Sequence, residues 1–439
     1  MYRKTIEELK IWEDRKDRKQ LIIRGARQVG KTWLMREFGQ TCYEKIAYIN
    51  LENNDRMTHL FKGDLHIDRL ITALQIESGV TITEENTLII FDEVQEVPKA
   101  LTSLKYFCEN APQYHIIAAG SLLSVALHPG TSFPVGKVDF IDLYPLNFHE
   151  FLVATGNENL EKLIQAMDFE LVTTFKGPLI DLLKQYYYVG GMPEAVASFV
   201  SNKNFAAVRE IQKRLLAAYE QDFSMHAPNE TVPRIRMLWN SVPKQLAKEN
   251  RKFVYGLIRE GARAREYELA MTWLLDCGLI YQVGRVLKPD IPLSAYQDFH
   301  AFKLYFLDIG LLSALGDLDV KSILEGNRIF EEFKGSLTEQ YVLQQLIATK
   351  EIKPYYWSAE KSTAEIDFLF QYDSEVVPIE VKATENLQAK SLKSYCAKYK
   401  PKYAIRSSMS DYRQEDWLTN VPLYAIPTIR EMISFREHD

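Results

Sequence analysis

The chain has 439 residues, 46% hydrophobic and 26% charged, which is enough for roughly two or three domains with buried cores. A net charge of −6 excludes a protein that binds nucleic acid over its whole surface and leaves that role to local basic patches. The charged first residues lack the apolar stretch of a signal peptide, and no apolar run reaches the ~18 residues of a membrane span. These two features lead us to expect no membrane contact and a cytoplasmic location. The four cysteines are widely spaced, so we expect reduced thiols, which agrees with that location.

In the first third of the chain, apolar runs of strand length alternate with helical stretches. This rhythm predicts an α/β domain with a parallel sheet. The expected strands are Gln20–Arg24, Ile46–Leu51, Thr87–Asp92, Tyr114–Ala119 and Val138–Leu143.

A complete phosphate-binding pattern, G-x-x-x-x-G-K-[ST], follows the first expected strand and precedes an expected helix. Its residues are Gly25, Ala26, Arg27, Gln28, Val29, Gly30, Lys31 and Thr32. Glycines let the backbone wrap with its N–H groups pointing inward, and the helix N-terminus adds a positive dipole. We expect Lys31 to reach the β- and γ-phosphates of ATP and the Thr32 hydroxyl to bind Mg²⁺.

The strand Thr87–Asp92 ends in two carboxylates, Asp92 and Glu93. In a P-loop protein the first can hold Mg²⁺ and the second can polarise the attacking water. The next strand ends at Ser121, which either senses the γ-phosphate or is a turn residue. Asn50 and Glu52 either contact the site or cap a turn.

The middle of the chain reads as mainly helical, with a tight turn at Gly190-Gly191. We interpret these glycines as structural, permitting positive φ or close backbone approach. Residues 263–295 predict a winged helix, with a helix at Glu266–Asp276 and a short ribbon near Gln282–Tyr296. Basic and acidic residues alternate around this segment, so binding to DNA and docking within the protein both stay open.

Two expected strands near the C-terminus, Glu365–Phe370 and Val376–Ala383, carry the order Asp367, Glu380, Lys382. This spacing resembles the PD-(D/E)xK nuclease core. Glu380 and Lys382 share a strand face, and Asp367 lies on the neighbouring strand. Asp367 and Glu380 can hold Mg²⁺ while Lys382 orients or deprotonates a water. An ordinary solvated hairpin, or a fold that grips DNA without cutting, is the alternative.

A basic stretch follows this hairpin. Between residues 386 and 410 the sequence has no acid, and tyrosines are interleaved with its basic side chains, which are Lys390, Lys393, Lys398, Lys400, Lys402 and Arg406. Such a stretch beside a metal site suits a DNA backbone, and a solvated helix face is the simpler alternative.

Taken together, these motifs resemble a large family of bacterial and archaeal AAA+-type ATPases with a C-terminal domain of uncharacterised function. The segments that carry the resemblance are GARQVGKTWLMREFG, INLE, LIIFDEVQ, AAGSLLS, LYPLNFHEF and GGMPEAV. The resemblance implies an AAA+ core (residues 1–155), a helical lid (156–230), a winged-helix segment (231–325) and a restriction-endonuclease-like α/β domain (326–439). It also implies that Glu339, on an expected helix, completes the nuclease-like site.

The sequence departs from the family before LYPL, where Gly136-Lys137 replaces the usual Gly-Arg pair. A lysine is a point charge and lacks the planar fork of an arginine finger. We therefore expect slow hydrolysis or another arginine in this role, and a homo-oligomer stays possible.

The function predicted from these residues is an ATP-binding and hydrolysing, Mg²⁺-dependent enzyme that acts on DNA. The alternative is a nucleotide-dependent switch that binds DNA or a protein partner and cleaves nothing.

Overall fold

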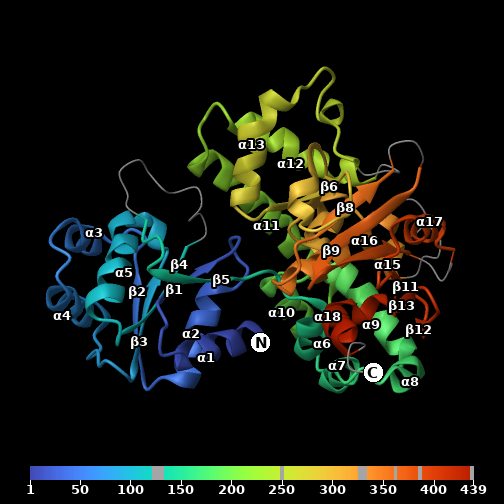
Figure 1. Ribbon diagram of the computed structural model, residues 1–439. Coiled ribbons are helices and arrows are strands. Elements are labelled where there is room, and N and C mark those ends of the chain that lie inside the picture. Colours follow the sequence, from blue (N-terminus) through green and yellow to red (C-terminus); the bar gives the residue numbers. More distant parts are fainter. Residues whose placement is uncertain (121–132, 248–251, 325–333, 360–362, 384–387, 436–439) are drawn as a thin grey trace. The chain divides into compact units, whose positions relative to one another are not determined.

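The computed structural model describes residues 1–120, 133–247, 252–324, 334–359, 363–383 and 388–435 (Figure 1). The chain forms two compact units. The N-terminal unit comprises Tyr2–Tyr144 with Asp276–Gly278, and the C-terminal unit comprises Pro145–Leu275 and Leu279–Asp439. The four-segment division at residues 155, 230 and 325 stays a prediction.

The N-terminal unit is built on a five-stranded sheet with strand order β2-β3-β4-β1-β5. Every neighbouring pair is parallel, which confirms the predicted α/β fold. The strands are β1 (Gln20–Arg24), β2 (Lys45–Asn50), β3 (Thr87–Asp92), β4 (His115–Ala119) and β5 (Val138–Asp142). The strand before Ser121, β4, lies between the P-loop strand β1 and the acidic strand β3.

Helices cover both faces of this sheet (Figure 1). On one side a buried cluster joins the sheet to α3 (Asp55–Lys62), α4 (Ile67–Ser78) and α5 (Pro98–Asn110). On the other side α2 (Lys31–Cys42) packs on the strands and on α1 (Thr5–Asp14), with Trp12 edge-on to Phe38. Both faces are buried, which explains why the strands read as continuous apolar runs.

The C-terminal unit begins with a run of helices. They are α6 (Phe148–Ala154), α7 (Glu158–Gln165), α8 (Phe169–Thr174), α9 (Lys176–Val189), α10 (Pro193–Asn202), α11 (Phe205–His226), α12 (Val232–Leu246) and α13 (Ala264–Asp276). Later helices are α14 (Ile309–Leu315), α15 (Val320–Leu324), α16 (Lys334–Ala348), α17 (Lys390–Tyr399) and α18 (Ile429–Phe435). Among the helices of the described residues, none has the length and apolar character of a membrane span.

The same unit contains one mixed eight-stranded sheet, in the order β12-β13-β11-β10-β9-β8-β6-β7. Its strands are β6 (Ile280–Val286), β7 (Gln297–Phe306), β8 (Tyr355–Ser358), β9 (Glu365–Tyr372), β10 (Glu375–Val381), β11 (Ile405–Ser408), β12 (Arg413–Gln414) and β13 (Thr419–Pro422). Parallel pairing of β6 with β8 joins the ribbon of the middle segment to the C-terminal strands.

The ribbon differs from its prediction. The second strand was expected before Tyr296, but β7 runs from Gln297 to Phe306. Pro289 and Pro292 cannot donate to a ladder, and a short 3₁₀ turn, Leu293–Tyr296, precedes the strand. The second half of β7 is wholly buried, so its side chains lack the alternation that identifies a strand with one solvated face.

Buried Asp308 links α14 and α16 to the glycine turn after α9 through hydrogen bonds. Its Oδ2 accepts hydrogen bonds from the Gly191 N–H (2.6 Å) and Gln344 Nε2 (3.0 Å), and its Oδ1 accepts one from the Leu311 N–H (3.0 Å). A Cβ on Gly190, at φ +72°, would lie 2.1 Å from Asp308 Oδ1. The glycine pair therefore permits the positive φ and close backbone approach expected from the sequence.

Asp308→Ala should destabilise the C-terminal unit by about 3 kcal/mol or more, because it leaves several buried donors without an acceptor. Urea unfolding followed by intrinsic fluorescence measures the change. Asp181→Ala, on an exposed position of α9, is the matched control. Equal midpoints for the two variants would contradict a central role for Asp308.

Candidate functional site

The P-loop follows β1 at the carboxyl edge of the parallel sheet. Its backbone takes left-handed or unusual conformations at Gly25 (φ +150°), Gln28 (φ +64°) and Gly30 (φ +95°). A Cβ on Gly25 would lie 2.3 Å from the carbonyl oxygen of Leu143, so a side chain at residue 25 would collide with the end of β5. The loop is thus held against the sheet where it leaves β1.

Lys31 opens α2 and is buried within this loop. Its Nζ donates hydrogen bonds to the carbonyl oxygens of Gly25 (2.9 Å) and Ala26 (2.7 Å). Burial lowers the pKa of Lys31 to about 8, and the carboxylates of Glu93 and Asp92 oppose this lowering. The ammonium therefore lies close to both acids, in the position where the sequence predicts phosphate binding.

Asp92, the last residue of β3, links the P-loop to the neighbouring strand β2. Its Oδ2 accepts hydrogen bonds from Thr32 Oγ1 (2.7 Å) and from the hydroxyl of Tyr48 (2.9 Å) on β2. A threonine hydroxyl and a carboxylate at this distance are the oxygen ligands that Mg²⁺ uses in P-loop enzymes. The donor set fits the ion predicted here.

Glu93 follows Asp92 in a left-handed conformation, with φ 51° and ψ 47°. Such a conformation costs a non-glycine residue roughly 1–2 kcal/mol, and strain of this kind clusters at functional sites. The Oε2 of Glu93 accepts a 2.6 Å hydrogen bond from Gln95 Nε2, which orients the carboxylate. This placement suits a residue that polarises water.

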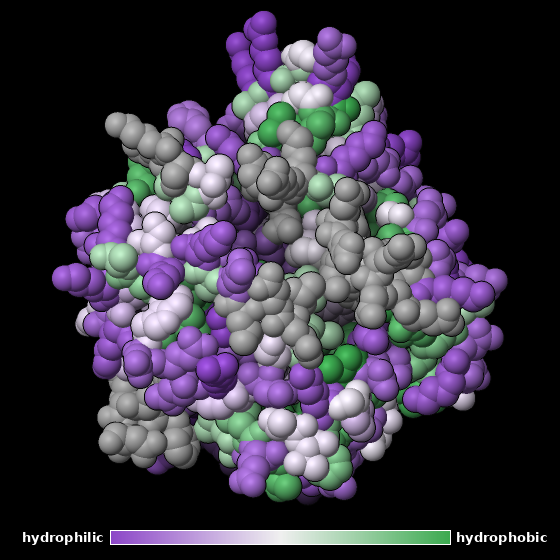
Figure 2. Space-filling model, turned by 90° about the vertical axis from the view of Figure 1, so that its right-hand side faces the viewer, coloured by the Kyte–Doolittle hydropathy of each residue, from purple (hydrophilic) through white to green (hydrophobic). Residues whose placement is uncertain are grey.

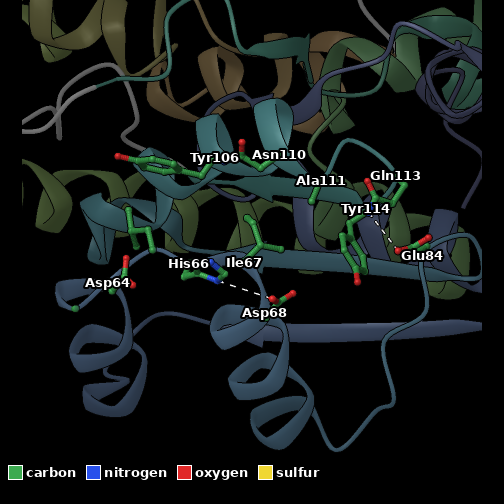
Figure 3. A pocket seen from close by; sticks show the side chains of 12 residues that line it. Asp64, His66, Ile67, Asp68, Glu84, Tyr106, Asn110, Ala111, Gln113 and Tyr114 are labelled. Carbon is green, nitrogen blue, oxygen red and sulfur yellow. Dashed lines mark hydrogen bonds and ion pairs between the residues drawn. The ribbon is translucent and has the colours of Figure 1, made fainter.

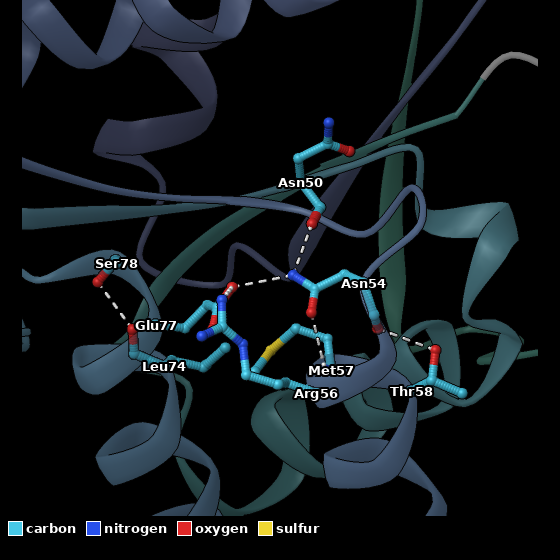
Figure 4. Close-up of polar contacts among 8 residues, drawn as sticks. All are labelled: Asn50, Asn54, Arg56, Met57, Thr58, Leu74, Glu77 and Ser78. Atoms are coloured by element: carbon cyan, nitrogen blue, oxygen red, sulfur yellow. Dashed lines mark hydrogen bonds and ion pairs between the residues drawn. The ribbon is translucent and has the colours of Figure 1, made fainter.

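Other predicted residues have different outcomes. Ser121 lies outside the described residues. Asn50 Oδ1 accepts from the Glu52 N–H (3.0 Å), which is a turn contact, and Asn50 O accepts from Asn54 Nδ2 (3.1 Å). Figure 4 shows Asn54 also bound to Glu77 and capping α3 through the Met57 N–H. These contacts are those of the turn that follows β2.

Lys137 lies far from the P-loop of its own chain. It precedes β5, whose first residue, Val138, pairs with Gln20, whereas the P-loop starts after Arg24 at the other end of β1. That strand length spans about 13 Å. Lys137 Nζ instead pairs with Glu109 Oε1 at 3.0 Å. It therefore cannot act as a finger on the nucleotide of its own chain.

A pocket of about 670 Å³ opens at the amino edge of the same sheet (Figure 3). Its lining includes Asp64, Asp68 and Glu84, with His66 paired to Asp68 at 3.9 Å. Carboxylates repel phosphate, and none of the P-loop residues lines the pocket. The residues predicted to bind the nucleotide therefore lie at the carboxyl edge of the sheet, away from this pocket.

In the C-terminal unit, β9 and β10 bring Asp367, Glu380 and Lys382 together. Asp367 Oδ2 accepts a 2.7 Å hydrogen bond from the Val381 N–H, and Lys382 Nζ lies 2.7 Å from Glu380 Oε1. Burial raises the pKa of Glu380, the Lys382 ammonium opposes this, and the nearby Asp367 carboxylate adds to it. The three side chains predicted to form one site are thus neighbours.

A β-bulge interrupts the pairing of β9 with β8 at Asp367. Tyr355 pairs with Leu369 and Trp357 with Ile366, so Asp367 and Phe368 of β9 face a single residue of β8. Bulges of this kind recur beside active sites because they redirect one side chain.

Glu339, on α16, has other partners. Its Oε2 accepts from the Tyr305 hydroxyl (3.1 Å) and lies 3.5 Å from Lys303 Nζ. Lys303 is fully buried on β7 and also pairs with Glu365 Oε1 at 2.5 Å. Within the described residues, no three or more His, Cys, Asp and Glu side chains form a metal-binding group. Among the residues that the structure describes, Asp367 and Glu380 therefore come together without a third carboxylate.

The basic stretch divides into exposed and buried side chains. Lys390, Lys393 and Lys398 are exposed on α17, but Arg406 is buried and donates to Asn420 Oδ1 at 2.9 Å. The interleaved tyrosines pack inward, with Tyr395 edge-on to Trp357. Tyr395 and Tyr403 are core residues, and partly buried Tyr399 packs against the core cluster that contains Tyr395. Figure 2 shows one face of the molecule, which is mostly hydrophilic with hydrophobic residues scattered over it.

Sequence reasoning missed several residues of these sites. Tyr48 lies on β2 and binds Asp92, but nothing in the strand pattern marks it. Lys303 could have been noticed as a single charge within the apolar run AFKLYFL. An isolated charge in a buried strand needs a partner, and here Glu365 and Glu339 supply it.

Three family models match consecutive parts of the chain. One described as an AAA domain matches residues 17–152, and two described as domains of unknown function match residues 180–322 and 334–426. Uncharacterized proteins of Mycobacterium tuberculosis and Mycobacterium bovis are each 24% identical over 372 residues, which cover 83% of this chain and 70% of theirs.

Solved structures with some similarity include the Walker-type ATPase PABY2304 of Pyrococcus abyssi. It has 14% identity and a TM-score of 0.42 over 71% of this chain and 94% of that one. The Aeropyrum pernix ORC1 protein in complex with DNA has 13% identity and a TM-score of 0.29 over 71% and 90%.

The AAA-domain match spans all five strands of the N-terminal sheet, the P-loop and the acidic pair. In P-loop ATPases these parts bind ATP and split it at the carboxyl edge of a parallel sheet. The N-terminal unit therefore contains an AAA domain, and the protein is a P-loop ATPase.

Proposed function

We propose that the protein is an ATP-driven, Mg²⁺-dependent enzyme that acts on DNA in the cytoplasm and cleaves it with the C-terminal unit. The observation that carries the proposal is the grouping of Asp367, Glu380 and Lys382 at the β9 bulge. Asp367 and Glu380 would hold one Mg²⁺, which would stabilise charge on the scissile phosphate. Lys382 would orient the attacking water.

The start of α17 supports a phosphate partner. The Leu392 N–H hydrogen-bonds to Glu380, and the Ser391 hydroxyl accepts from the Glu365 N–H at 3.4 Å. This helix therefore begins beside the candidate site. Exposed Lys390 and Lys393 lie on its first turns and add positive charge for a DNA backbone.

In the N-terminal unit, Thr32 and Asp92 would hold Mg²⁺ on the nucleotide. Lys31 and the inward N–H groups of Gly25–Thr32 would bind the phosphates. Glu93 would accept a proton from the attacking water. Since Lys137 lies at the opposite edge of its own sheet, an arginine from a second copy would complete the site in a homo-oligomer.

A non-cleaving, nucleotide-dependent switch is the second candidate. The contact that favours it is the burial of Glu339 against Lys303 and Tyr305, because a helix acid neutralised in this way adds no charge to a metal site. In that case the C-terminal unit would grip DNA or a protein partner.

Lys31→Ala should abolish ATP turnover, because the phosphates lose their only buried ammonium in this loop. Phosphate release measured at saturating ATP tests this. Lys45→Ala, an exposed change at the start of β2, should leave turnover unchanged. Turnover retained by Lys31→Ala would overturn the assignment.

Glu93→Gln should bind ATP with an affinity close to that of the wild type and hydrolyse it at least ~100-fold more slowly, the usual size of a lost general base. Binding is measured by calorimetry and turnover by phosphate release. Wild-type turnover would show that Glu93 does not polarise the water.

Asp367→Asn and Lys382→Ala should each reduce DNA cleavage to background while ATP turnover persists. Asparagine keeps an acceptor for the Val381 N–H, so the hairpin should stay folded. Linear, supercoiled and branched DNA are incubated with Mg²⁺ or Mn²⁺, with and without ATP. Glu375→Gln, on the same hairpin, is the control.

Failure of the wild type to cut any substrate, with turnover intact, would favour the switch. The comparison with and without ATP shows whether the two sites are coupled.

A further inference from the structure

Arg3 contacts the outer side of the P-loop from the segment that precedes α1. It is 4% exposed, and its guanidinium donates to two backbone carbonyls. Nη1 donates to Val29 O at 3.0 Å and Nη2 to Tyr144 O at 2.6 Å. A planar fork with several donors can bridge two acceptors in this way, whereas an ammonium cannot match its geometry.

Val29 belongs to the loop, and its carbonyl shares a peptide plane with the Gly30 N–H. In a trans peptide the C=O and N–H point in opposite directions. A guanidinium that holds Val29 O on the outside therefore turns the Gly30 N–H toward the inside. Inward N–H groups are what a P-loop offers to phosphate oxygens.

The loop needs such an external restraint. Gln28 and Gly30, which flank Val29, both have positive φ, at 64° and 95°. Unusual conformations persist only where the surroundings fix them. Gly25 is fixed by contact with Leu143, and the Leu143 N–H donates to Arg24 O at 2.8 Å. Arg3 supplies the corresponding restraint at the far end of the loop and anchors it to Tyr144, next to the same strand end.

We propose that Arg3 is a positioning residue for ATP binding, which presents the Gly30 N–H to the nucleotide phosphates through its hydrogen bond to Val29. It touches neither substrate nor metal in this role. The pattern G-x-x-x-x-G-K-[ST] gives no hint of it, because Arg3 lies outside the motif.

The test measures Kd for ATP and for ADP by calorimetry, and kcat and KM by phosphate release, in Arg3→Met and Arg3→Lys. Arg3→Met should raise both Kd values and the KM about tenfold, with kcat within about twofold, since the reacting groups stay in place. Arg3→Lys should fall between Arg3→Met and the wild type. Lys10→Met, at an exposed position of α1, is the matched control.

Chemical rescue separates positioning from general support of the fold. Methylguanidinium at millimolar concentration should restore ATP affinity to Arg3→Ala, whereas methylammonium, with the same charge but no fork, should not. If Arg3→Ala does not fold, Arg3→Lys keeps the proposal testable.

Three results would overturn the proposal. The first is Kd values within twofold of the wild type in both Arg3→Met and Arg3→Lys. The second is a fall in binding stoichiometry at unchanged Kd, which marks a loss of folded protein. The third is equal rescue by both cations.

Discussion

The parallel alignment of the five N-terminal strands is the constraint on which the nucleotide site depends. Parallel strands bring all their carboxyl ends to one edge, so Thr32 and Asp92, which are 60 residues apart, meet at 2.7 Å. The same alignment sends the amino ends to the opposite edge, where Lys137 and the acidic pocket lie. Strand direction therefore brings Thr32 and Asp92 together and keeps Lys137 of the same chain away from them.

Much of this arrangement could be predicted because its signals are local. Each buried strand is a short apolar run, and the P-loop pattern lies directly between β1 and α2. The contacts that secure the loop from outside could not be predicted. Arg3 contacts the loop and Tyr48 contacts Asp92, and no spacing along the chain encodes a side chain that comes from a distant element.

The C-terminal unit was harder to predict for the same reason. Its hairpin carried a recognisable spacing, and Asp367, Glu380 and Lys382 are neighbours as expected. Glu339 lies on α16, a helix as expected, but its carboxylate pairs with Lys303 of β7. A motif specifies residue types at given spacings, but it does not show whether a buried charge from a distant element pairs with one of those residues.

The pairing of β6 with β8 has a consequence for the stability of the two segments that it joins. Two family models divide the unit between residues 322 and 334, yet the strands on either side of that division share hydrogen bonds in one sheet. Gln340 of α16 also binds both backbone groups of Phe306 on β7. Separating the two parts would expose unpaired strand edges, which promote aggregation. In this chain the segments matched by the two family models therefore share one sheet and belong to a single structural unit.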